Sequence, residues 1–142
     1  MSNKKRVAVY CRVAREDDNA INEQKQKVTI FAEKQGFNNL SVYADKGASE
    51  ISLDRPDFLR MLRDIEAGTV NTVMVYDFGR FSRNAVETGR FVENVFPKYG
   101  VRFISVLDGF DSADYESGAN YTTSINPIRV ILDLHKKFNE KV

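Results

Sequence analysis

Hydrophobic and polar positions follow two different periods along this 142-residue chain. Four short runs of apolar, β-branched or aromatic residues are typical of buried strands, at 6–13, 40–44, 72–76 and 101–107. Between them, apolar residues recur at helical spacing, which predicts a helix that ends at Gly36, one from Pro56 to Gly68 and one from Val86 to Pro97. This alternation favours a three-layer α/β fold, in which helices flank a mostly parallel sheet of four or more strands.

Three polar segments separate these elements, and we expect each to be a loop, at 45–53, 78–84 and 108–124. A last periodic segment, 128–138, carries an apolar stripe that includes His135. We therefore expect one domain over residues 1–125 and the start of a long C-terminal helix over residues 126–142. Because the chain ends inside that helix, the sequence indicates a piece of a longer protein.

Composition narrows the class of protein. With 42% hydrophobic residues, 29% charged residues and three prolines, the chain is typical of a globular domain. Its 21 basic and 20 acidic residues nearly cancel, so composition gives no sign of the strongly basic surface of a dedicated DNA-binding module, and any anion site must be local. No apolar run has the length of a membrane span or a signal peptide, and the single cysteine, Cys11, cannot form an internal disulfide. We expect a cytoplasmic protein.

The sequence also indicates no cofactor and no metal. It contains neither a glycine-rich dinucleotide fingerprint nor a phosphate-loop lysine motif. One histidine and one cysteine, His135 and Cys11, cannot form a standard zinc site.

Arginines stand where sites form in a parallel sheet, at the carboxyl ends of strands and in the loops that follow. Arg12 ends the first strand, Arg55 precedes the second helix, and Arg80 and Arg83 follow the third strand. Each one alone is most simply a solvated surface charge. Together, their planar and permanently charged guanidinium groups are suited to the extra negative charge of a phosphoryl transition state.

Four motifs, in this order along the chain, resemble those of the resolvase/invertase family of serine site-specific recombinases. They are Tyr10-Cys11-Arg12-Val13-Ala14, Glu23-Gln24, Asp54-Arg55-Pro56-Asp57-Phe58 and Arg80-Phe81-Ser82-Arg83-Asn84. The resemblance spans nearly the whole chain. It implies the N-terminal catalytic domain of an enzyme that cleaves and exchanges DNA strands, with Arg12, Arg55, Arg80 and Arg83 around the scissile phosphate and Gln24 in support.

The resemblance also implies a nucleophilic serine at position 14, which would form a 5'-phosphoserine intermediate. This chain has Ala14 instead, and a methyl group has no lone pair with which to attack phosphorus. We therefore expect the chain not to cleave DNA. An alanine in an otherwise intact motif is typical of a deliberately disarmed enzyme, and a naturally inactive relative is the alternative. Ser49, Ser52 and Ser82 do not replace the missing hydroxyl, since Ser82 fits a structural place between two arginines.

A second departure is Gly79, where many relatives carry an acidic residue, whereas Asp77 lies two positions earlier. The segment 108–117 and the Arg-Phe-Ser-Arg-Asn motif look more like large recombinases of phages and mobile elements, which act as integrases or transposases. By the same resemblance, the terminal helix builds a homodimer and the tetramer of the synaptic complex on double-stranded DNA.

Two other classes of function remain open from the sequence. One is a naturally inactive recombinase-like module that binds DNA or a recombinase partner and regulates it. The other is a small doubly wound signalling or nucleotide-binding domain, although the chain lacks the phosphate-binding glycines that such a domain needs. For this chain we expect only weak, salt-sensitive DNA binding, because phosphate contacts position a protein without reading bases.

Overall fold

A five-stranded sheet with the order β2-β1-β3-β4-β5 forms the centre of the molecule. The computed structural model describes residues 6–14, 17–47, 55–82 and 84–114. The strands are β1 (Arg6–Val13), β2 (Leu40–Lys46), β3 (Val70–Val75), β4 (Arg102–Ser105) and β5 (Phe110–Asp111). The first four are parallel and β5 pairs antiparallel with β4, which confirms the mostly parallel sheet.

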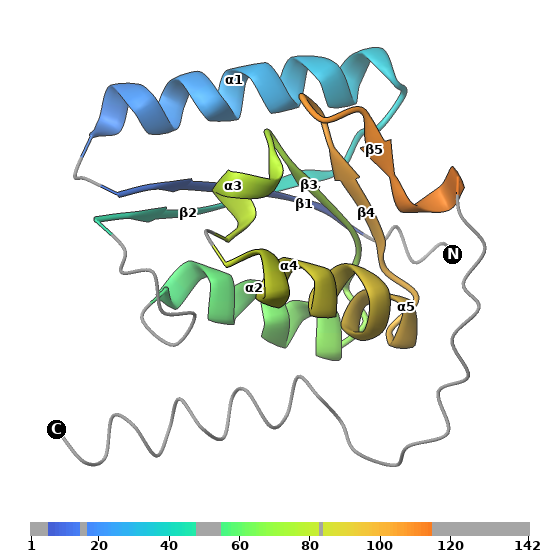
Figure 1. The fold of residues 1–142 in the computed structure, drawn as a ribbon. Coiled ribbons are helices and arrows are strands. Elements are labelled where there is room, and N and C mark those ends of the chain that lie inside the picture. The colour runs from blue at the N-terminus through green and yellow to red at the C-terminus, as the bar shows by residue number, and fades with distance from the viewer. Residues whose placement is uncertain (1–5, 15–16, 48–54, 83, 115–142) are drawn as a thin grey trace, which may run out of the picture.

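Helices cover both faces of this sheet (Figure 1). Helix α1 (Asp18–Lys34) lies on one face, and α2 (Pro56–Glu66) and a helical run of α4 (Ala85–Arg90), η2 (Phe91–Val95) and α5 (Phe96–Lys98) lie on the other. The short helices α3 (Phe78–Phe81) and η3 (Ser112–Asp114) follow β3 and β5. The predicted three-layer α/β fold is therefore confirmed for the part of the chain that the structure describes.

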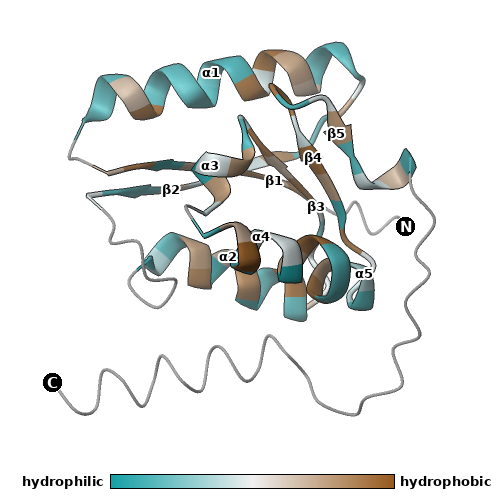
Figure 2. Ribbon diagram, viewed as in Figure 1, coloured by the Kyte–Doolittle hydropathy of each residue, from teal (hydrophilic) through white to brown (hydrophobic). Residues whose placement is uncertain are grey.

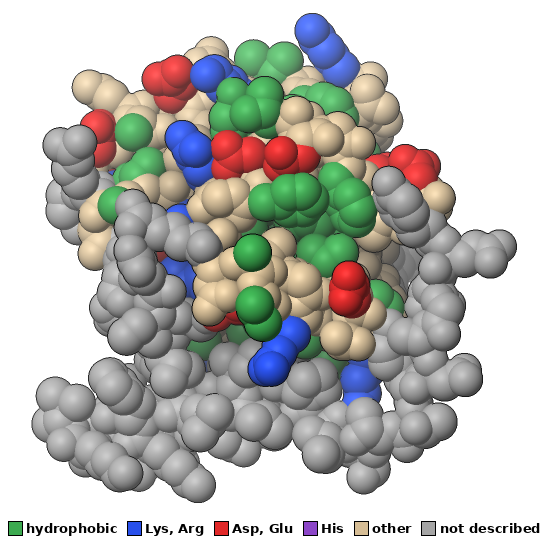
Figure 3. All heavy atoms as spheres, viewed as in Figure 1, with side chains coloured by type: hydrophobic (Ala, Val, Ile, Leu, Met, Phe, Trp, Pro, Cys, Tyr) green, Lys and Arg blue, Asp and Glu red, His purple; other side chains and the backbone are tan. Residues whose placement is uncertain are grey.

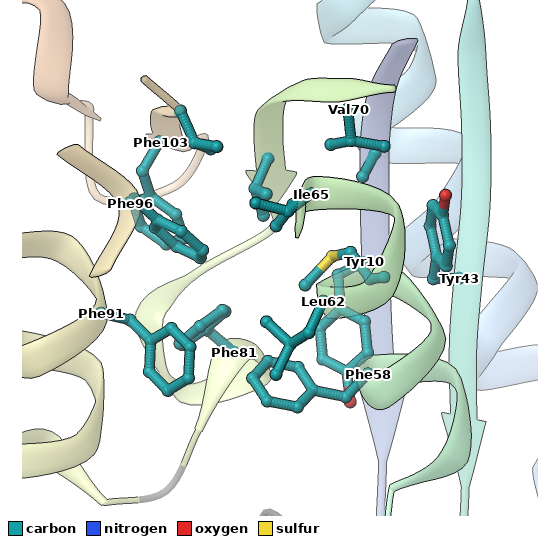
Figure 4. Packing of buried hydrophobic residues seen from close by; sticks show 14 of the residues in the cluster. Tyr10, Tyr43, Phe58, Leu62, Ile65, Val70, Phe81, Phe91, Phe96 and Phe103 are labelled. Atoms are coloured by element: carbon teal, nitrogen blue, oxygen red, sulfur yellow. The ribbon is translucent and has the colours of Figure 1, made fainter. Parts of the chain in front are cut away.

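The buried strands separate two hydrophobic clusters (Figure 2). The cluster under α1 contains Val9, Cys11 and Val28. The cluster on the opposite face is rich in aromatic rings, and Phe58, Phe81 and Phe91 contact one another edge to face with centroids 5.5 Å apart (Figure 4). Because Phe81 belongs to α3, this packing fixes the short helix that also carries Arg80.

Several predicted boundaries were wrong. Residues 78–84 were predicted as a loop, but Phe78–Phe81 form α3, because Asp77 caps its first turn and Phe81 is buried. The segment 108–124 was also predicted as a loop, yet Phe110–Asp111 pair with β4. Asp45 belongs to β2 rather than to a loop, and the third helical run passes Pro97 to end at Lys98. The predicted helix over 126–142 lies outside the described residues.

Candidate functional site

Arg12 lies near the carboxyl end of β1, at the edge of the sheet where the predicted site residues converge. Its side chain is only 6% exposed, and its Nη2 donates a hydrogen bond of 2.6 Å to the carbonyl oxygen of Gly79. Since β1 and β3 are parallel neighbours, the segment after β3 falls beside the end of β1. This contact joins the first predicted motif to the residue directly before the last one.

Gln24 holds the backbone of Arg12. From α1, its amide Nε2 donates to the carbonyl oxygen of Arg12 at 2.9 Å, and its Oε1 accepts from the Arg12 N–H at 3.2 Å. The amide side chain is buried, and it pairs both polar groups of a residue that has reached the end of its strand. Gln24 therefore fixes the direction in which the chain leaves β1.

Ala14 is exposed and lies in a pocket of about 410 Å³ at this edge. The residues that line it are Arg12, Val13, Ala14, Gly79 and Arg80. The structure thus brings together three of the predicted site residues, Ala14, Arg12 and Arg80. The two guanidinium groups make this pocket cationic. The methyl group of Ala14 cannot act as a nucleophile.

Arg80 reaches the pocket from α3 and is half-exposed. Its Nη1 lies 3.1 Å from Asp77 Oδ2, while Asp77 Oδ1 accepts the backbone N–H of Arg80 at 2.9 Å. Asp77 is thus both the N-terminal cap of α3 and the counter-ion of Arg80. A Cβ atom on Gly79 would lie 3.5 Å from Asp77 Oδ1, so the Asp77 carboxylate stands beside position 79, where the resemblance to the family implies an acidic residue.

Arg55 does not line this pocket. It stands at the N-terminal boundary of α2 and is 1% exposed, with its guanidinium carbon 4.0 Å from the centre of the Phe58 ring. Its two terminal nitrogens donate to the carbonyl oxygen of Phe81 at 2.6 Å and to Glu87 Oε1 at 2.8 Å. Arg83 lies outside the described residues, and so do Ser49 and Ser52.

The motif that follows Arg80 has structural roles as well. Ser82 is buried, and its Oγ accepts the N–H of Asn84 at 3.0 Å. Asn84 in turn caps α4, since its Oδ1 accepts from the N–H groups of Val86 and Glu87. Ser82 is therefore committed to a turn, as expected, and does not present a free hydroxyl to the pocket.

Two titratable side chains of β1, Tyr10 and Cys11, have pKa values that burial raises. Burial is the main cause that raises the pKa of the Tyr10 hydroxyl, and it raises the pKa of the Cys11 thiol to about 12. Over the described ranges, no three His, Cys, Asp or Glu residues are grouped so as to hold a metal ion. Nor does any helix in those ranges have the length and apolar character needed to span a membrane.

Two acidic residues that pair with buried side chains, Asp45 and Glu87, were not predicted from the sequence. Asp45, at 4% exposure, accepts hydrogen bonds from Tyr10 Oη, the Asp57 N–H and the Phe58 N–H, at 2.7, 2.9 and 3.0 Å. It therefore supplies the N-terminal cap of α2 from a neighbouring strand. Glu87 is the carboxylate that pairs with Arg55. The sequence offered two weak signals: Asp45 stands at the end of an apolar strand, and Glu87 stands four positions after Arg83.

The fold and the pocket define an α/β domain with a cationic site at the carboxyl edge of a mostly parallel sheet. The chain belongs to the serine recombinase family, because residues 7–126 match the family model described as the N-terminal domain of resolvase.

Solved structures agree with this assignment. The N-terminal catalytic domain of TP901-1 integrase is 30% identical, with a TM-score of 0.69, and the match covers 96% of this chain and 98% of that domain. A resolvase family site-specific recombinase from Streptococcus pneumoniae is 28% identical, with a TM-score of 0.66 and coverage of 97% and 90%. Among curated proteins, uncharacterized immunity region protein 3 of Bacillus phage phi105 is 35% identical over 68 residues, which are 45% of this chain and 83% of the phage protein.

Proposed function

We propose that this chain is the catalytic domain of a site-specific DNA recombinase of a phage or mobile element, in a form that binds the DNA backbone but does not cleave it. The observation that carries the proposal is the pocket in which Ala14 lies with Arg12 and Arg80. Family membership supplies the reaction, and the pocket supplies the place where a phosphate fits between two guanidinium groups.

In the active form of such a site, a hydroxyl at position 14 attacks the scissile phosphorus. The bond from serine Oγ to phosphorus forms and the bond to the 3' oxygen breaks, and the proton that the serine hydroxyl gives up passes through water to the leaving 3' oxygen. Arg12 and Arg80 stabilise the charge that grows on the phosphate oxygens. Arg55 and Arg83 are proposed to join them, and Gln24 to keep the end of β1 in place. In our proposal, neither a metal nor a cofactor takes part.

The first test is the variant Ala14→Ser on supercoiled DNA that includes the regions flanking the protein's own gene. We expect protein attached covalently to 5' ends, detected as labelled DNA that migrates with protein in denaturing gels, and no such product from the alanine protein. Ala14→Ser combined with Arg80→Gln is the matched control. It should form the complex about a hundredfold more slowly, because one donor to the transition state is lost.

The proposed partners are double-stranded DNA and further copies of the chain, as a homodimer and as a tetramer in the synaptic complex. An apolar groove of about 420 Å³, lined by residues that include Phe78, Val92 and Phe110, supports self-association. Figure 3 shows hydrophobic side chains gathered on this face, near α3, α4 and β5. Since the substrate is DNA of a phage or a bacterial element, the proposed place of action is the cytoplasm.

A second candidate function is a naturally inactive module that binds DNA or a recombinase and regulates it. The similarity to a phage protein named for an immunity region favours this candidate, together with alanine at position 14. Two observations separate the candidates. A serine codon at position 14 in the parent gene would exclude the regulatory function. An Ala14→Ser protein that binds its DNA without forming a covalent complex would support the regulatory function.

A further inference from the structure

Arg55 is buried among described residues of β1, α2, α3 and α4. Its guanidinium lies over the Phe58 ring at 4.0 Å, with the Tyr10 ring at 6.0 Å, and only 1% of the residue is exposed. Nη1 donates to the Phe81 carbonyl oxygen and Nη2 to Glu87. A guanidinium in this position cannot touch a DNA phosphate, since its terminal nitrogens are engaged and solvent is excluded.

The backbone of Glu87 is anchored at the N-terminal end of α4. Glu87 lies in the first turn of α4, and its backbone N–H is bonded to the capping Asn84 Oδ1 at 3.1 Å. Its side chain is 21% exposed, so the ion pair has one side near solvent while Arg55 is wholly inside. Within the described ranges, Glu87 is the one carboxylate paired with Arg55 in the structure.

A carboxylate and a phosphate use the same donors of an arginine, because both offer two oxygens to its planar fork. We propose that Glu87 holds Arg55 in a closed position, and that a DNA phosphate must displace Glu87 before Arg55 joins Arg12 and Arg80. This inference rests on the proposed function. It assigns to Glu87 the role of a positioning residue that withholds one catalytic cation until DNA is present.

The same contacts extend to the segment that follows Arg80. Phe81 and Glu87, the two partners of Arg55, stand on either side of residues 82–86. Release of Arg55 therefore removes one hydrogen bond at each end of this segment, while the Phe81 ring stays packed against Phe58. The Glu87–Arg55 ion pair, called the latch below, thus links the arginine before α2 to the Arg80–Asn84 motif.

The test compares DNA affinity in two variants that lose the same charge. Glu87→Gln removes the counter-ion of Arg55, and Glu93→Gln removes an exposed carboxylate from the same helical run. Binding to a short labelled duplex at low salt is followed by fluorescence anisotropy. We expect Glu87→Gln to bind about tenfold more tightly and Glu93→Gln less than about twofold, because a single exposed charge is screened by salt. Adding Arg55→Gln to Glu87→Gln should abolish the tenfold gain.

Equal gains in Glu87→Gln and Glu93→Gln would overturn the latch, and so would weaker binding by Glu87→Gln at an unchanged fold. A second measurement needs neither DNA nor activity: hydrogen exchange of the Arg55 Nε–H, observed by nitrogen-15 NMR. It should be slow in the unchanged protein and much faster in Glu87→Gln, and equal rates would refute the closed position. If Arg12→Gln and Arg80→Gln leave DNA binding unchanged, the proposed function fails, whatever the exchange rates show.

Discussion

The hydrogen bonds and the ion pair around position 14 do not involve the side chain of Ala14. Arg12 is bonded to Gly79, Gln24 pairs both polar groups of the Arg12 backbone, and Arg80 has Asp77 beside it. None of these contacts uses the side chain at position 14. These hydrogen bonds therefore do not depend on the residue at position 14, and we expect the variant Ala14→Ser to keep them.

Cys11 gives a prediction at the same scale. Its thiol is buried under α1, and burial raises its pKa to about 12, so at neutral pH almost none of it is the reactive thiolate. The folded protein should react with a thiol reagent at least about a hundredfold more slowly than the chain in denaturant. Absorbance after addition of a chromogenic disulfide measures both rates. Equal rates would contradict a buried Cys11.

Individual residues also show what the sequence could predict. The positions of Arg12 and Arg80 at the carboxyl edge of the sheet follow from where the first and third strands end in a parallel sheet, and hydrophobic spacing predicts both strands. The burial of Arg55 does not follow, because it depends on the ring of Phe58 and on Glu87, which meet Arg55 only in the folded protein. Asp45 was missed for the same reason, since its partners lie on two other elements, β1 and α2.

Among the elements, the strands and long helices were predictable because each has a run of apolar residues at a clear period. The short elements were not. Helix α3 has four residues and is stabilised by the Asp77 cap and by Phe81, and β5 has two residues and depends on its pairing with β4. Such elements exist through tertiary contacts, which local periodicity does not record.

The edge strand β5 gives a pH prediction. Arg102 on β4 donates two hydrogen bonds to the Asp111 carboxylate, at 2.9 and 2.6 Å, and these bonds lower the Asp111 pKa below its usual value of 3.8. A carboxyl with a lowered pKa stabilises the fold above its unfolded pKa, and this contribution is lost as the pH falls through the folded pKa.

We therefore expect stability to fall below about pH 4, with Asp111→Asn removing roughly 0.5 kcal/mol of that dependence, a small figure because the pair is partly exposed. Urea unfolding at several pH values measures it, with Asp114→Asn as control. An unchanged pH profile in Asp111→Asn would show that the pair contributes nothing.

For the whole molecule, Asp45 joins three elements that are distant in the sequence. Its carboxylate on β2 binds Tyr10 on β1 and two N–H groups in the first turn of α2. Since Asp45 is buried, removing its acceptors leaves polar groups without partners, which costs more than the bond itself contributes.

Asp45→Ala should lower the free energy of unfolding by about 3 kcal/mol, and Tyr10→Phe, which removes one of the three bonds, by about 1 kcal/mol. Chemical denaturation followed by circular dichroism gives both values. A loss in Asp45→Ala no larger than that in Tyr10→Phe would mean that the N–H groups of α2 find other acceptors.

The hydrogen bond from Arg12 to Gly79 spans 67 positions of the chain. Arg12, Val13 and Ala14, on one wall of the pocket, are translated early, whereas Gly79 and Arg80 follow only after β2, α2 and β3. A ribosome-bound chain that stops before β3 therefore lacks one wall of the pocket. The pocket is complete only when β3 has joined β1, so it forms late in the synthesis and folding of the domain.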